Sequence, residues 1–475
     1  MNTKNWDILS SGTPQSLEEL KSILLRNRNI GKQESEEFLN PIIPNLITLK
    51  KLGIAKREVD KAITRILEAR DKGQQVIVYG DYDADGVCAS AILWETLYSL
   101  KVKALPYLPD RFSEGYGINR KSIESLKKKY PDLGLIITVD NGIVAGDAVA
   151  FANSIDTDVI ITDHHEVSEI LPEAYAIIHT KKLSGSGVSW ILSREILKFL
   201  DQEIEDRGLE LAAIGTIADQ LPLTGACRSF VKYGLLSLRK TIRPGLICLY
   251  EVSAIESSNI GIYEVSFILA PRINSSGRMT HAIDSLRLIC TKDKIKALEL
   301  SNSLEKTNLN RQEVVESVVK SVLKMSNNEE KAVVVSDESY HEGVIGLAAS
   351  KIVEKYYKPA IVISKGEKLS KASGRSIRGF NIIEAIRSLS HLIVEGGGHE
   401  MAAGFTIETV KIEEFTGKFY ELARAISDQI FVRKLIIDCP LDFNLINWEL
   451  INILDIFSPF GAGNPQPIFI TKQIK

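Results

Sequence analysis

The stretch that decides the fold reads Val76-Ile77-Val78-Tyr79-Gly80-Asp81-Tyr82-Asp83-Ala84-Asp85-Gly86. Its first four residues are β-branched or aromatic, which is typical of a buried strand, and three aspartates follow at once. The next stretch, Val87 to Leu100, has the length and composition of a helix. Open α/β sheets bind ligands beyond the carboxyl ends of their strands, so this pattern predicts a ligand site at residues 81–86.

A calcium-binding EF-hand is the competing interpretation, because its loop also begins with D-x-D-x-D-G. Position twelve of such a loop is normally Glu, whereas here it is Ile92. A strand rather than a helix also precedes the aspartates. These two differences exclude the EF-hand and leave solvated turn aspartates as the alternative for this motif alone.

Further apolar stretches end in the same way. Val139 leads into Asp140-Asn141-Gly142, and Thr162 leads into Asp163-His164-His165-Glu166. A fourth stretch ends at Asp219 after a helical region. Taken separately, Asp140 could cap a helix and one histidine could belong to the core. Their repetition at successive element ends favours one shared site.

Several aspartate oxygens with one or two imidazoles form a ligand set suited to Mn²⁺ or Mg²⁺, although ligand type alone leaves zinc open. Crowded carboxylates repel one another unless cations neutralise them. We expect two ions that share a carboxylate such as Asp140. A two-ion site of this kind suits in-line displacement at phosphorus.

The pattern along the chain predicts two α/β blocks. Between about residues 75 and 225, short β-branched runs alternate with stretches of helical length, as in a parallel sheet covered by helices. A second block begins at residues 332–335 and continues to about residue 425. Residues 291–326 contain no Gly or Pro and repeat apolar residues at helical spacing, which predicts one long connecting helix. Two helices with a bend are the alternative.

Bulk properties narrow the function classes. The net charge of −3 does not indicate a basic nucleic-acid-binding face, although bound cations would reverse the local field at an acidic cluster. The five cysteines form no C-x-x-C pair, so we expect reduced, buried thiols. No apolar run of about 18 residues or secretory signal is present, so we expect a cytoplasmic protein without membrane contact.

The four acidic motifs resemble those of the DHH phosphoesterases, named for the Asp-His-His that stands here as Asp163-His164-His165. Residues 81–86 are similar to the RecJ branch, and Tyr79 stands where small-substrate branches carry His. The resemblance implies catalytic roles for Asp83, Asp140, His164 and His165. It implies metal ligation by Asp81, Asp83, Asp85, Asp140, His164 and Asp219.

The second block is similar to the DHHA1 domain, through residues 339–346, 373–376 and 396–405. Residues 110–117 and 272–279 also resemble RecJ segments. The resemblance implies substrate binding by Arg111, Asn274, Arg278, Ser373, Gly374, Arg375 and His399. The alternatives are tight turns for the glycines and surface salt bridges for Arg111 and Arg278.

The chain of 475 residues is longer than a single hydrophobic core supports. Residues 457–467 resemble the entry into a RecJ oligonucleotide-binding (OB) barrel, but only eight residues follow, so we expect this barrel to be missing or incomplete. We therefore predict an α/β protein in which a long helix joins a parallel-sheet DHH domain to a smaller α/β DHHA1 domain. The expected parts are a helical lead-in (1–45), the DHH catalytic domain (46–235), a helical connector (236–328), the DHHA1 substrate-binding domain (329–430) and a truncated OB-type start (431–475).

The resemblance implies a Mn²⁺- or Mg²⁺-dependent exonuclease that hydrolyses single-stranded DNA from the 5′ end to mononucleotides, in DNA repair and recombination. Replication or repair proteins, such as a helicase or a single-strand-binding protein, are the partners it implies. One alternative is a DHH/DHHA1 phosphodiesterase for short oligonucleotides or cyclic dinucleotides. Another is a catalytically silent nucleic-acid-binding scaffold, although such a scaffold is expected to lose metal ligands and all candidates are present here.

Overall fold

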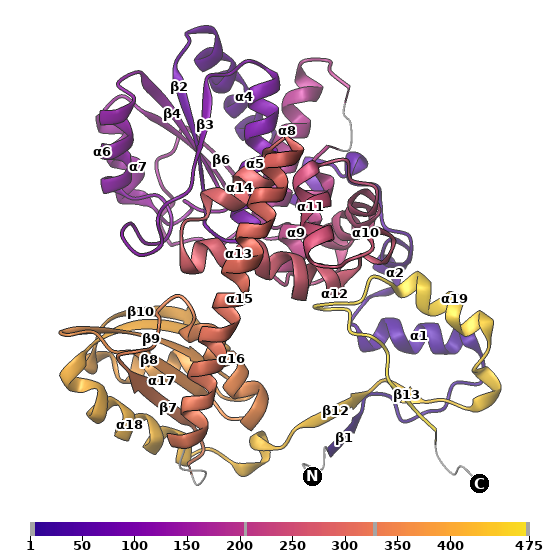
Figure 1. Cartoon of the computed structure of the whole chain (residues 1–475). Coiled ribbons are helices and arrows are strands. Elements are labelled where there is room, and N and C mark those ends of the chain that lie inside the picture. Colours follow the sequence, from indigo (N-terminus) through magenta and orange to yellow (C-terminus); the bar gives the residue numbers. More distant parts are fainter. Residues whose placement is uncertain (1–4, 204–206, 326–329, 472–475) are drawn as a thin grey trace. The chain divides into compact units, whose positions relative to one another are not determined.

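The computed structural model describes residues 5–203, 207–325 and 330–471, which form two compact units. Of these described residues, the larger unit combines those between 10 and 308 with those from 438 onward, and the smaller combines those up to residue 9 with those between 309 and 437. The division falls inside helix α15 (Lys294–Met325), a single helix of 32 residues (Figure 1). The prediction of one long helix is confirmed.

The larger unit is built on a five-stranded parallel sheet in the order β3-β2-β4-β5-β6. Its strands are β2 (Gln75–Gly80), β3 (Ala104–Tyr107), β4 (Leu133–Val139), β5 (Asp158–Asp163) and β6 (Ala176–His179). Every residue of β2 and β4 is buried, because helices cover both faces of a parallel sheet. The predicted parallel sheet is confirmed.

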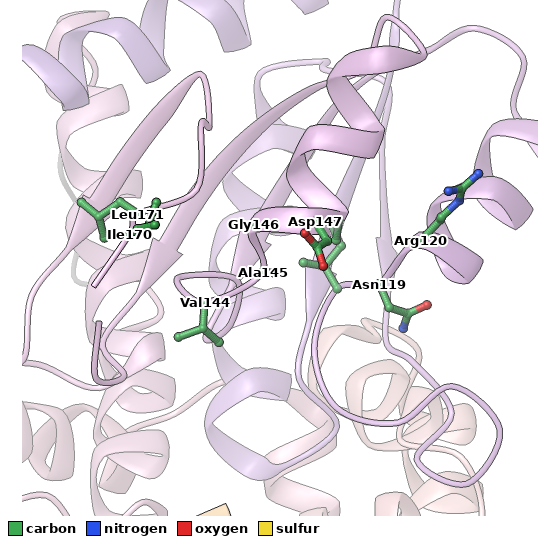
Figure 2. A pocket seen from close by; sticks show the side chains of 10 residues that line it. Asn119, Arg120, Val144, Ala145, Gly146, Asp147, Ile170 and Leu171 are labelled. Atoms are coloured by element: carbon green, nitrogen blue, oxygen red, sulfur yellow. The ribbon is translucent and has the colours of Figure 1, made fainter. Parts of the chain in front are cut away.

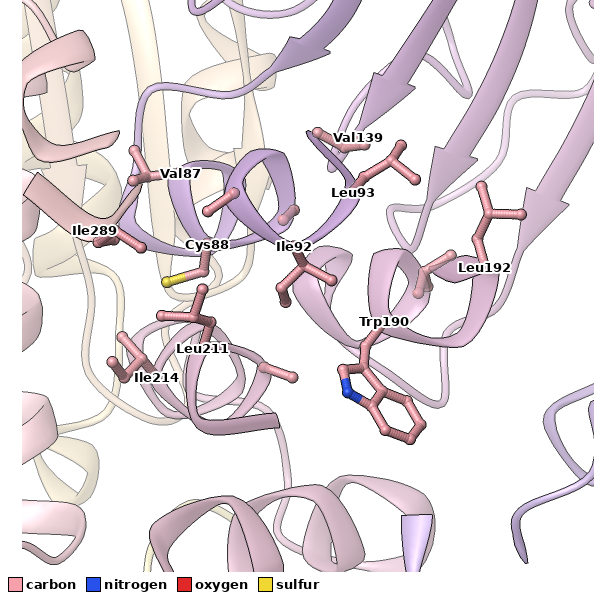
Figure 3. Close-up of a cluster of buried hydrophobic side chains, with 14 of the residues drawn as sticks. Val87, Cys88, Ile92, Leu93, Val139, Trp190, Leu192, Leu211, Ile214 and Ile289 are labelled. Carbon is pink, nitrogen blue, oxygen red and sulfur yellow. The ribbon is translucent and has the colours of Figure 1, made fainter. Parts of the chain in front are cut away.

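The side chains of successive β2 residues point to opposite faces of the sheet, as in any pleated strand. Val76 and Val78 belong to the main core, while Ile77 and Tyr79 belong to a smaller core on the other face. The main core includes residues of α4 (Lys56–Asp71), α5 (Ala84–Ser99), α8 (Gly185–Phe199), α9 (Leu209–Ala218) and α10 (Gly225–Arg239). Figure 3 shows part of it, including Val87, Ile92 and Leu93 of α5, Trp190 and Leu192 of α8, and Leu211 and Ile214 of α9. The smaller core includes residues of α6 (Arg120–Lys129) and α7 (Gly146–Ser154).

A further group of helices precedes α15 in the chain. It consists of α11 (Pro244–Val252), α12 (Ile262–Glu264), a π-helical turn (Val265–Leu269), α13 (Ala270–Met279) and α14 (Ile283–Cys290). Residues 262–279 form one uninterrupted helical segment. Ile273, on α13, belongs to the main core and ties the segment to the larger unit.

The lead-in and the last part of the chain fold together within the larger unit. Helices α1 (Leu17–Asn27), α2 (Lys32–Leu39) and α19 (Trp448–Phe457) share one hydrophobic cluster. The buried Arg28 donates to Asp438 Oδ1 at 3.2 Å and to Asn464 Oδ1 at 2.7 Å. Among residues 438–471 the only paired strands are β13 (Cys439–Pro440) and β14 (Phe469–Ile470), which form no closed barrel.

The smaller unit has a five-stranded mixed sheet in the order β10-β11-β9-β8-β7. Only β7 and β8 are parallel. The strands are β7 (Val333–Asp337), β8 (Ala360–Ser364), β9 (Leu369–Arg375), β10 (Ile393–His399) and β11 (Ala402–Glu408). Helix α16 (Ile345–Tyr356) packs in one hydrophobic cluster, and α17 (Ile382–Ser388) and α18 (Ile412–Arg424) pack in another. A separate parallel pair joins β1 (Asn5–Ile8) to β12 (Lys434–Ile437). The predicted smaller α/β domain is confirmed.

Two composition-based expectations concern the whole chain. All five cysteines are free, and four of them are buried while Cys290 is half-buried. Among the described residues, no helix combines the length and the apolar character that a membrane span needs. The predicted domain boundaries at residues 45, 235, 328 and 430 remain predictions.

Candidate active site

The three aspartates of residues 81–86 lie where β2 ends and α5 begins. Asp83 caps α5, because its carboxylate accepts from the backbone N–H groups of Asp85 at 2.9 Å and Gly86 at 3.0 Å. Asp81 accepts from the N–H of Tyr82 at 2.7 Å. A Cβ at Gly86 would lie 2.6 Å from the backbone oxygen of Asp81, so the turn requires glycine there. The turn therefore points its carboxylates to the carboxyl edge of the sheet.

Asp140 follows β4, the strand next to β2, and is 2 % exposed. Its backbone has a φ of 64°, in the left-handed region where Asp and Asn are tolerated better than most residues. Its Oδ1 accepts no hydrogen bond from a described residue, although His164 Nε2 lies 3.0 Å away. A Cβ added to Gly185 would come within 2.3 Å of this same oxygen, so α8 begins in direct contact with Asp140.

Asp163, the last residue of β5, positions its neighbours. Its Oδ1 lies 2.7 Å from His165 Nδ1, and its Oδ2 accepts from the Ile143 N–H at 2.9 Å. Burial opposes ionisation, but these hydrogen bonds and the charge of His165 hold the pKa of Asp163 below its usual range. An ionised carboxylate only accepts, so His165 Nδ1 carries the proton in this pair.

His165 is held between Asp163 and Tyr116. Its Nε2 lies 3.2 Å from the Tyr116 hydroxyl, and 44 % of its side chain is exposed. Partial burial lowers the pKa of His165, but the hydrogen bond to Asp163 and the surrounding carboxylates raise it to about 9. Without bound cations, His165 is therefore a cation at neutral pH that can reach a ligand.

Asp85 and Asp219 complete the acidic group. Asp85 accepts from the N–H groups of Gly185 at 2.6 Å and Ser186 at 3.0 Å, at the start of α8. Asp219 ends α9, and its Oδ2 lies 3.6 Å from His164 Nε2. The carboxylate at residue 219 thus follows a helix, whereas Asp81, Asp140 and Asp163 lie at strand ends.

All six side chains predicted as metal ligands lie in one cluster, which we call the acidic cluster. Its ligand atoms form overlapping sets whose members lie within 4.8 Å of one another. Asp140 takes part in two sets and His164 in two. The sets are Asp81 with Asp83 and Asp140, Asp85 with His164 and Asp219, and Asp140 with His164 and His165.

The electrostatics of the acidic cluster favour cation binding. Burial, followed by the charges of neighbouring aspartates, raises the pKa values of Asp81, Asp83 and Asp140, and that of Asp219 to about 8. Burial lowers the pKa of His164, which favours the neutral imidazole that binds metals. Buried carboxylates that repel one another, with a neutral imidazole among them, fit divalent cations.

Three predicted substrate-binding residues border the acidic cluster. The Arg111 guanidinium lies 5.2 Å from the centre of the Tyr82 ring. Asn274 Oδ1 accepts from the Ala84 N–H at 2.7 Å, which ties α13 to the start of α5. The charge of Arg278 acts on Asp83, where it partly offsets the rise in pKa caused chiefly by burial.

The other four predicted substrate-binding residues lie together in the smaller unit. Ser373, Gly374 and Arg375 end strand β9, and His399 ends β10. His399 pairs with Ala402, which pairs with Arg375, so the two side chains share one row of the sheet. The Arg375 guanidinium donates to Ser373 Oγ at 3.0 Å.

Several residues of the site were not predicted. Tyr116 contacts His165, while Gly185 and Gly215 leave room for carboxylates. Asp163 was expected at this edge of the sheet, but its role in holding His165 was not predicted. A Cβ at Gly215 would lie 2.0 Å from Asp85 Oδ1. Tyr116, Asp163 and Gly215 stand inside recognisable motifs, but Gly185 carries no local signal beyond the Gly-Ser-Gly run at residues 185–187.

A separate surface pocket lies between the starts of α6 and α7 (Figure 2). Its lining includes Asn119, Arg120, Val144, Asp147, Ile170 and Leu171. None of its lining residues belongs to the acidic cluster, so this pocket is distinct from the candidate active site.

The sequence matches three family profiles: the DHH family N-terminal domain at residues 75–216, the DHHA1 domain at 329–426 and the RecJ OB domain at 437–475. It is 36% identical to the single-stranded-DNA-specific exonuclease RecJ of Bacillus subtilis, covering 86% of this chain and 53% of that protein. Against the RecJ of Salmonella typhimurium it is 31% identical, covering 86% of this chain and 77% of the relative. The chain belongs to the RecJ family.

A solved RecJ structure agrees with this assignment. The RecJ of Thermus thermophilus in complex with Mn²⁺ superposes with a TM-score of 0.85 at 29% identity. The superposition covers 98% of this chain and 69% of the Thermus chain. This RecJ-family chain spans about half the length of the Bacillus relative and about three quarters of the Salmonella relative.

Tyr79 lies on β2, two residues before Asp81. Its side chain is fully buried on the sheet face opposite the main core. Its hydroxyl lies 3.2 Å from the Gly117 carbonyl oxygen and 3.1 Å from Ser122 Oγ. Tyr79 therefore supports the loop that carries Tyr116 and is not part of the acidic cluster.

Proposed function

We propose that the chain hydrolyses phosphodiester bonds of single-stranded DNA from the 5′ end and releases mononucleotides. The observation that carries this proposal is the acidic cluster, in which six candidate ligands meet at the carboxyl edge of the sheet. The Bacillus and Salmonella relatives are named single-stranded-DNA-specific exonucleases, which supports the substrate class. The proposal places the chain in DNA repair and recombination in the cytoplasm, with a helicase or a single-strand-binding protein as a partner.

We assign two cation positions from the overlapping ligand sets. Asp81, Asp83 and Asp140 would hold one ion, and Asp85, His164 and Asp219 the other, with Asp140 between them. Mn²⁺ and Mg²⁺ are the candidates, since Thermus RecJ has been solved with each. Such ions, when bound, supply Lewis acidity toward the phosphate and toward water.

The side chains beside the assigned cation positions would orient the phosphate. His165, protonated and fixed by Asp163, would donate a hydrogen bond to an oxygen of the scissile phosphate. Tyr116, whose hydroxyl contacts His165 Nε2, limits the directions in which that imidazole can turn. Arg111 and Arg278 would bind neighbouring phosphate oxygens, because a guanidinium offers several donors in one plane.

In the smaller unit, we assign Ser373, Gly374, Arg375 and His399 to the DNA backbone. The sheet register places Arg375 and His399 in one row, which suits contacts to phosphate groups of one strand. A Cβ at Gly346 would lie 2.9 Å from Arg375 Nη2, so α16 begins close against this guanidinium. That packing limits where the Arg375 side chain can move.

The direct test is nucleotide release from 5′- and 3′-labelled single strands of graded length, with Mn²⁺, Mg²⁺ or Zn²⁺ added. We expect metal-dependent release from the 5′ end of long strands by the wild type and by Asp147→Asn, which alters an exposed carboxylate outside the acidic cluster. Asp140→Asn should lower the rate by at least about 10²-fold.

Other outcomes would redirect the assignment. Activity confined to strands of a few nucleotides would indicate a small-substrate phosphodiesterase. Tight strand binding without hydrolysis in any metal would indicate a silent scaffold. Equal rates on duplex and single strands would contradict single-strand specificity.

A further inference from the structure

Two aromatic rings stand exposed on the helical segment of residues 262–279. Tyr263 is 63 % exposed and Phe267 is 68 % exposed. Their ring centres lie 5.1 Å apart, with 37° between the ring planes. The opposite side of the segment is buried through Val265, Leu269 and Ile273. Single exposed apolar residues are common, but two aromatic rings in contact offer a continuous flat surface to a ligand.

The helical segment that carries this aromatic pair also carries Asn274 and Arg278, which border the acidic cluster. Asn274 and Arg278 are half-buried, whereas Ile273 and Gly277 are buried, so the solvent-accessible face of the segment includes Asn274 and Arg278 together with the two rings. Phe267 lies roughly 16 Å along the helix from Arg278, at about 1.5 Å per residue.

The end of this face nearest the acidic cluster is fixed. Asn274 accepts from the Ala84 N–H at 2.7 Å. A Cβ at Gly277 would lie 2.4 Å from the Tyr82 carbonyl oxygen, so the helix and the motif turn are in direct contact. A strand with its end at the acidic cluster can therefore follow this face outward to Phe267 and Tyr263.

A basic group lies next to the start of the segment. Arg239, at the end of α10, donates from Nε to the Ile260 carbonyl oxygen at 2.8 Å, which holds its guanidinium near residue 260. Single-strand-binding surfaces combine aromatic rings, on which bases stack regardless of sequence, with positive groups along the backbone. The aromatic pair supplies the rings, and Arg239 supplies a positive group held at residue 260, three residues before Tyr263.

We propose that Tyr263 and Phe267 form a stacking platform for bases of the single strand a few nucleotides from the end bound at the acidic cluster. This inference rests on the proposed function and adds to it a sequence-independent contact. The platform holds the part of the strand that has not yet been cleaved. It therefore contributes to affinity for longer strands and leaves hydrolysis of dinucleotides unchanged.

The test measures binding of 3′-labelled oligothymidylate strands in EDTA by fluorescence anisotropy, so that neither hydrolysis nor a label on the 5′ end interferes. The double variant Tyr263→Ala/Phe267→Ala should raise Kd about five- to hundredfold for strands long enough to reach the platform. An abasic site moved through the first eight nucleotides should weaken wild-type binding at one or two positions. At those positions it should have no effect on the double variant.

Two matched variants separate stacking from general apolar contact. Tyr263→Phe keeps the aromatic face and should bind as the wild type does. Val410→Ala removes an aliphatic side chain that is 87 % exposed in the smaller unit, beyond the end of β11 opposite the row that holds Arg375, and should also bind normally. Phe267→Leu keeps apolar area but loses the aromatic face, so it should weaken binding.

The two proposals fail in different ways. If the wild type releases nucleotides but the double variant matches its Kd at every length, the platform is wrong and the exonuclease assignment stands. If the wild type releases no nucleotides in any metal, the exonuclease assignment fails. The abasic scan still tests the platform, because it measures binding alone, and an identical scan for wild type and double variant would overturn it.

Discussion

At the scale of single residues, Asp140 is a candidate metal ligand that lowers the stability of the metal-free protein. Its carboxylate is buried beside Asp85, Asp83 and Asp81, and burial together with these charges raises its pKa well above the usual value. A carboxyl whose pKa is raised on folding makes the folded state less stable as pH rises above its unfolded pKa. Neutral pH lies above the unfolded pKa, so the metal-free protein carries part or all of this cost there.

Asp140→Asn should remove that cost while removing the shared ligand. Asparagine matches the shape of aspartate and tolerates a φ of 64°. We expect the melting temperature in EDTA to rise by a few degrees. Added Mn²⁺ should stabilise the wild type more than the variant, because a ligand stabilises the state that binds it. Calorimetry with and without Mn²⁺ checks both parts, and a variant that melts lower than wild type in EDTA would contradict the argument.

At the scale of elements, helix starts and strand ends position the site, and this level was partly predictable. Alternating β runs and helical stretches placed Asp81, Asp140 and Asp163 at neighbouring strand ends, because parallel strands point their carboxyl ends to one edge. The contacts of Gly185 and Gly215 with Asp140 and Asp85 depend on how α8 and α9 pack against the sheet. No local pattern in the sequence encodes such packing.

Gly185→Ala tests the close approach of α8 to β4. The new methyl group would lie 2.3 Å from Asp140 Oδ1 and 2.4 Å from Asp140 Cβ, so the aspartate or the helix start must shift. A misplacement of about 1 Å can lower a rate about 10²-fold, and we expect a loss of that order in Mn²⁺-dependent nucleotide release. Gly146→Ala, at the start of α7 where no atom lies within 4 Å, should keep wild-type activity. Equal rates for the two variants would show that the packing tolerates a side chain.

At the scale of the whole chain, contacts between residues far apart in sequence hold the first and last segments of the larger unit together. Arg228 on α10 is fully buried and donates to backbone oxygens of both ends of the unit. Its Nε lies 2.6 Å from the Phe38 oxygen, and its Nη2 lies 2.8 Å from the Ser458 oxygen. The sequence motifs predicted a separate lead-in and C-terminal region, but contacts across hundreds of residues leave no local pattern from which their joint packing could be predicted.

Arg228→Met should remove the hydrogen bonds that hold these segments to α10 and should leave the acidic cluster unchanged. Methionine fills much of the volume but leaves buried carbonyl oxygens without donors, which costs about 1–3 kcal/mol. We expect a lower midpoint of urea unfolding with nucleotide release preserved at low temperature. Lys240→Met, at an exposed position just after the same helix, should leave the midpoint unchanged. An unchanged midpoint in Arg228→Met would mean that water replaces the lost donors.

The placement of Arg228 also has a consequence for how the chain is made. On a ribosome, Arg228 is synthesised 228 residues before Ile456, another of its acceptors. At about 5–20 residues per second, the interval is on the order of ten to fifty seconds. Residues 309–437, the C-terminal part of the smaller unit, are translated within that interval, so this unit can fold while the larger unit still lacks its last segment. During synthesis the larger unit is therefore completed last, after the chain of the smaller unit has been translated in full.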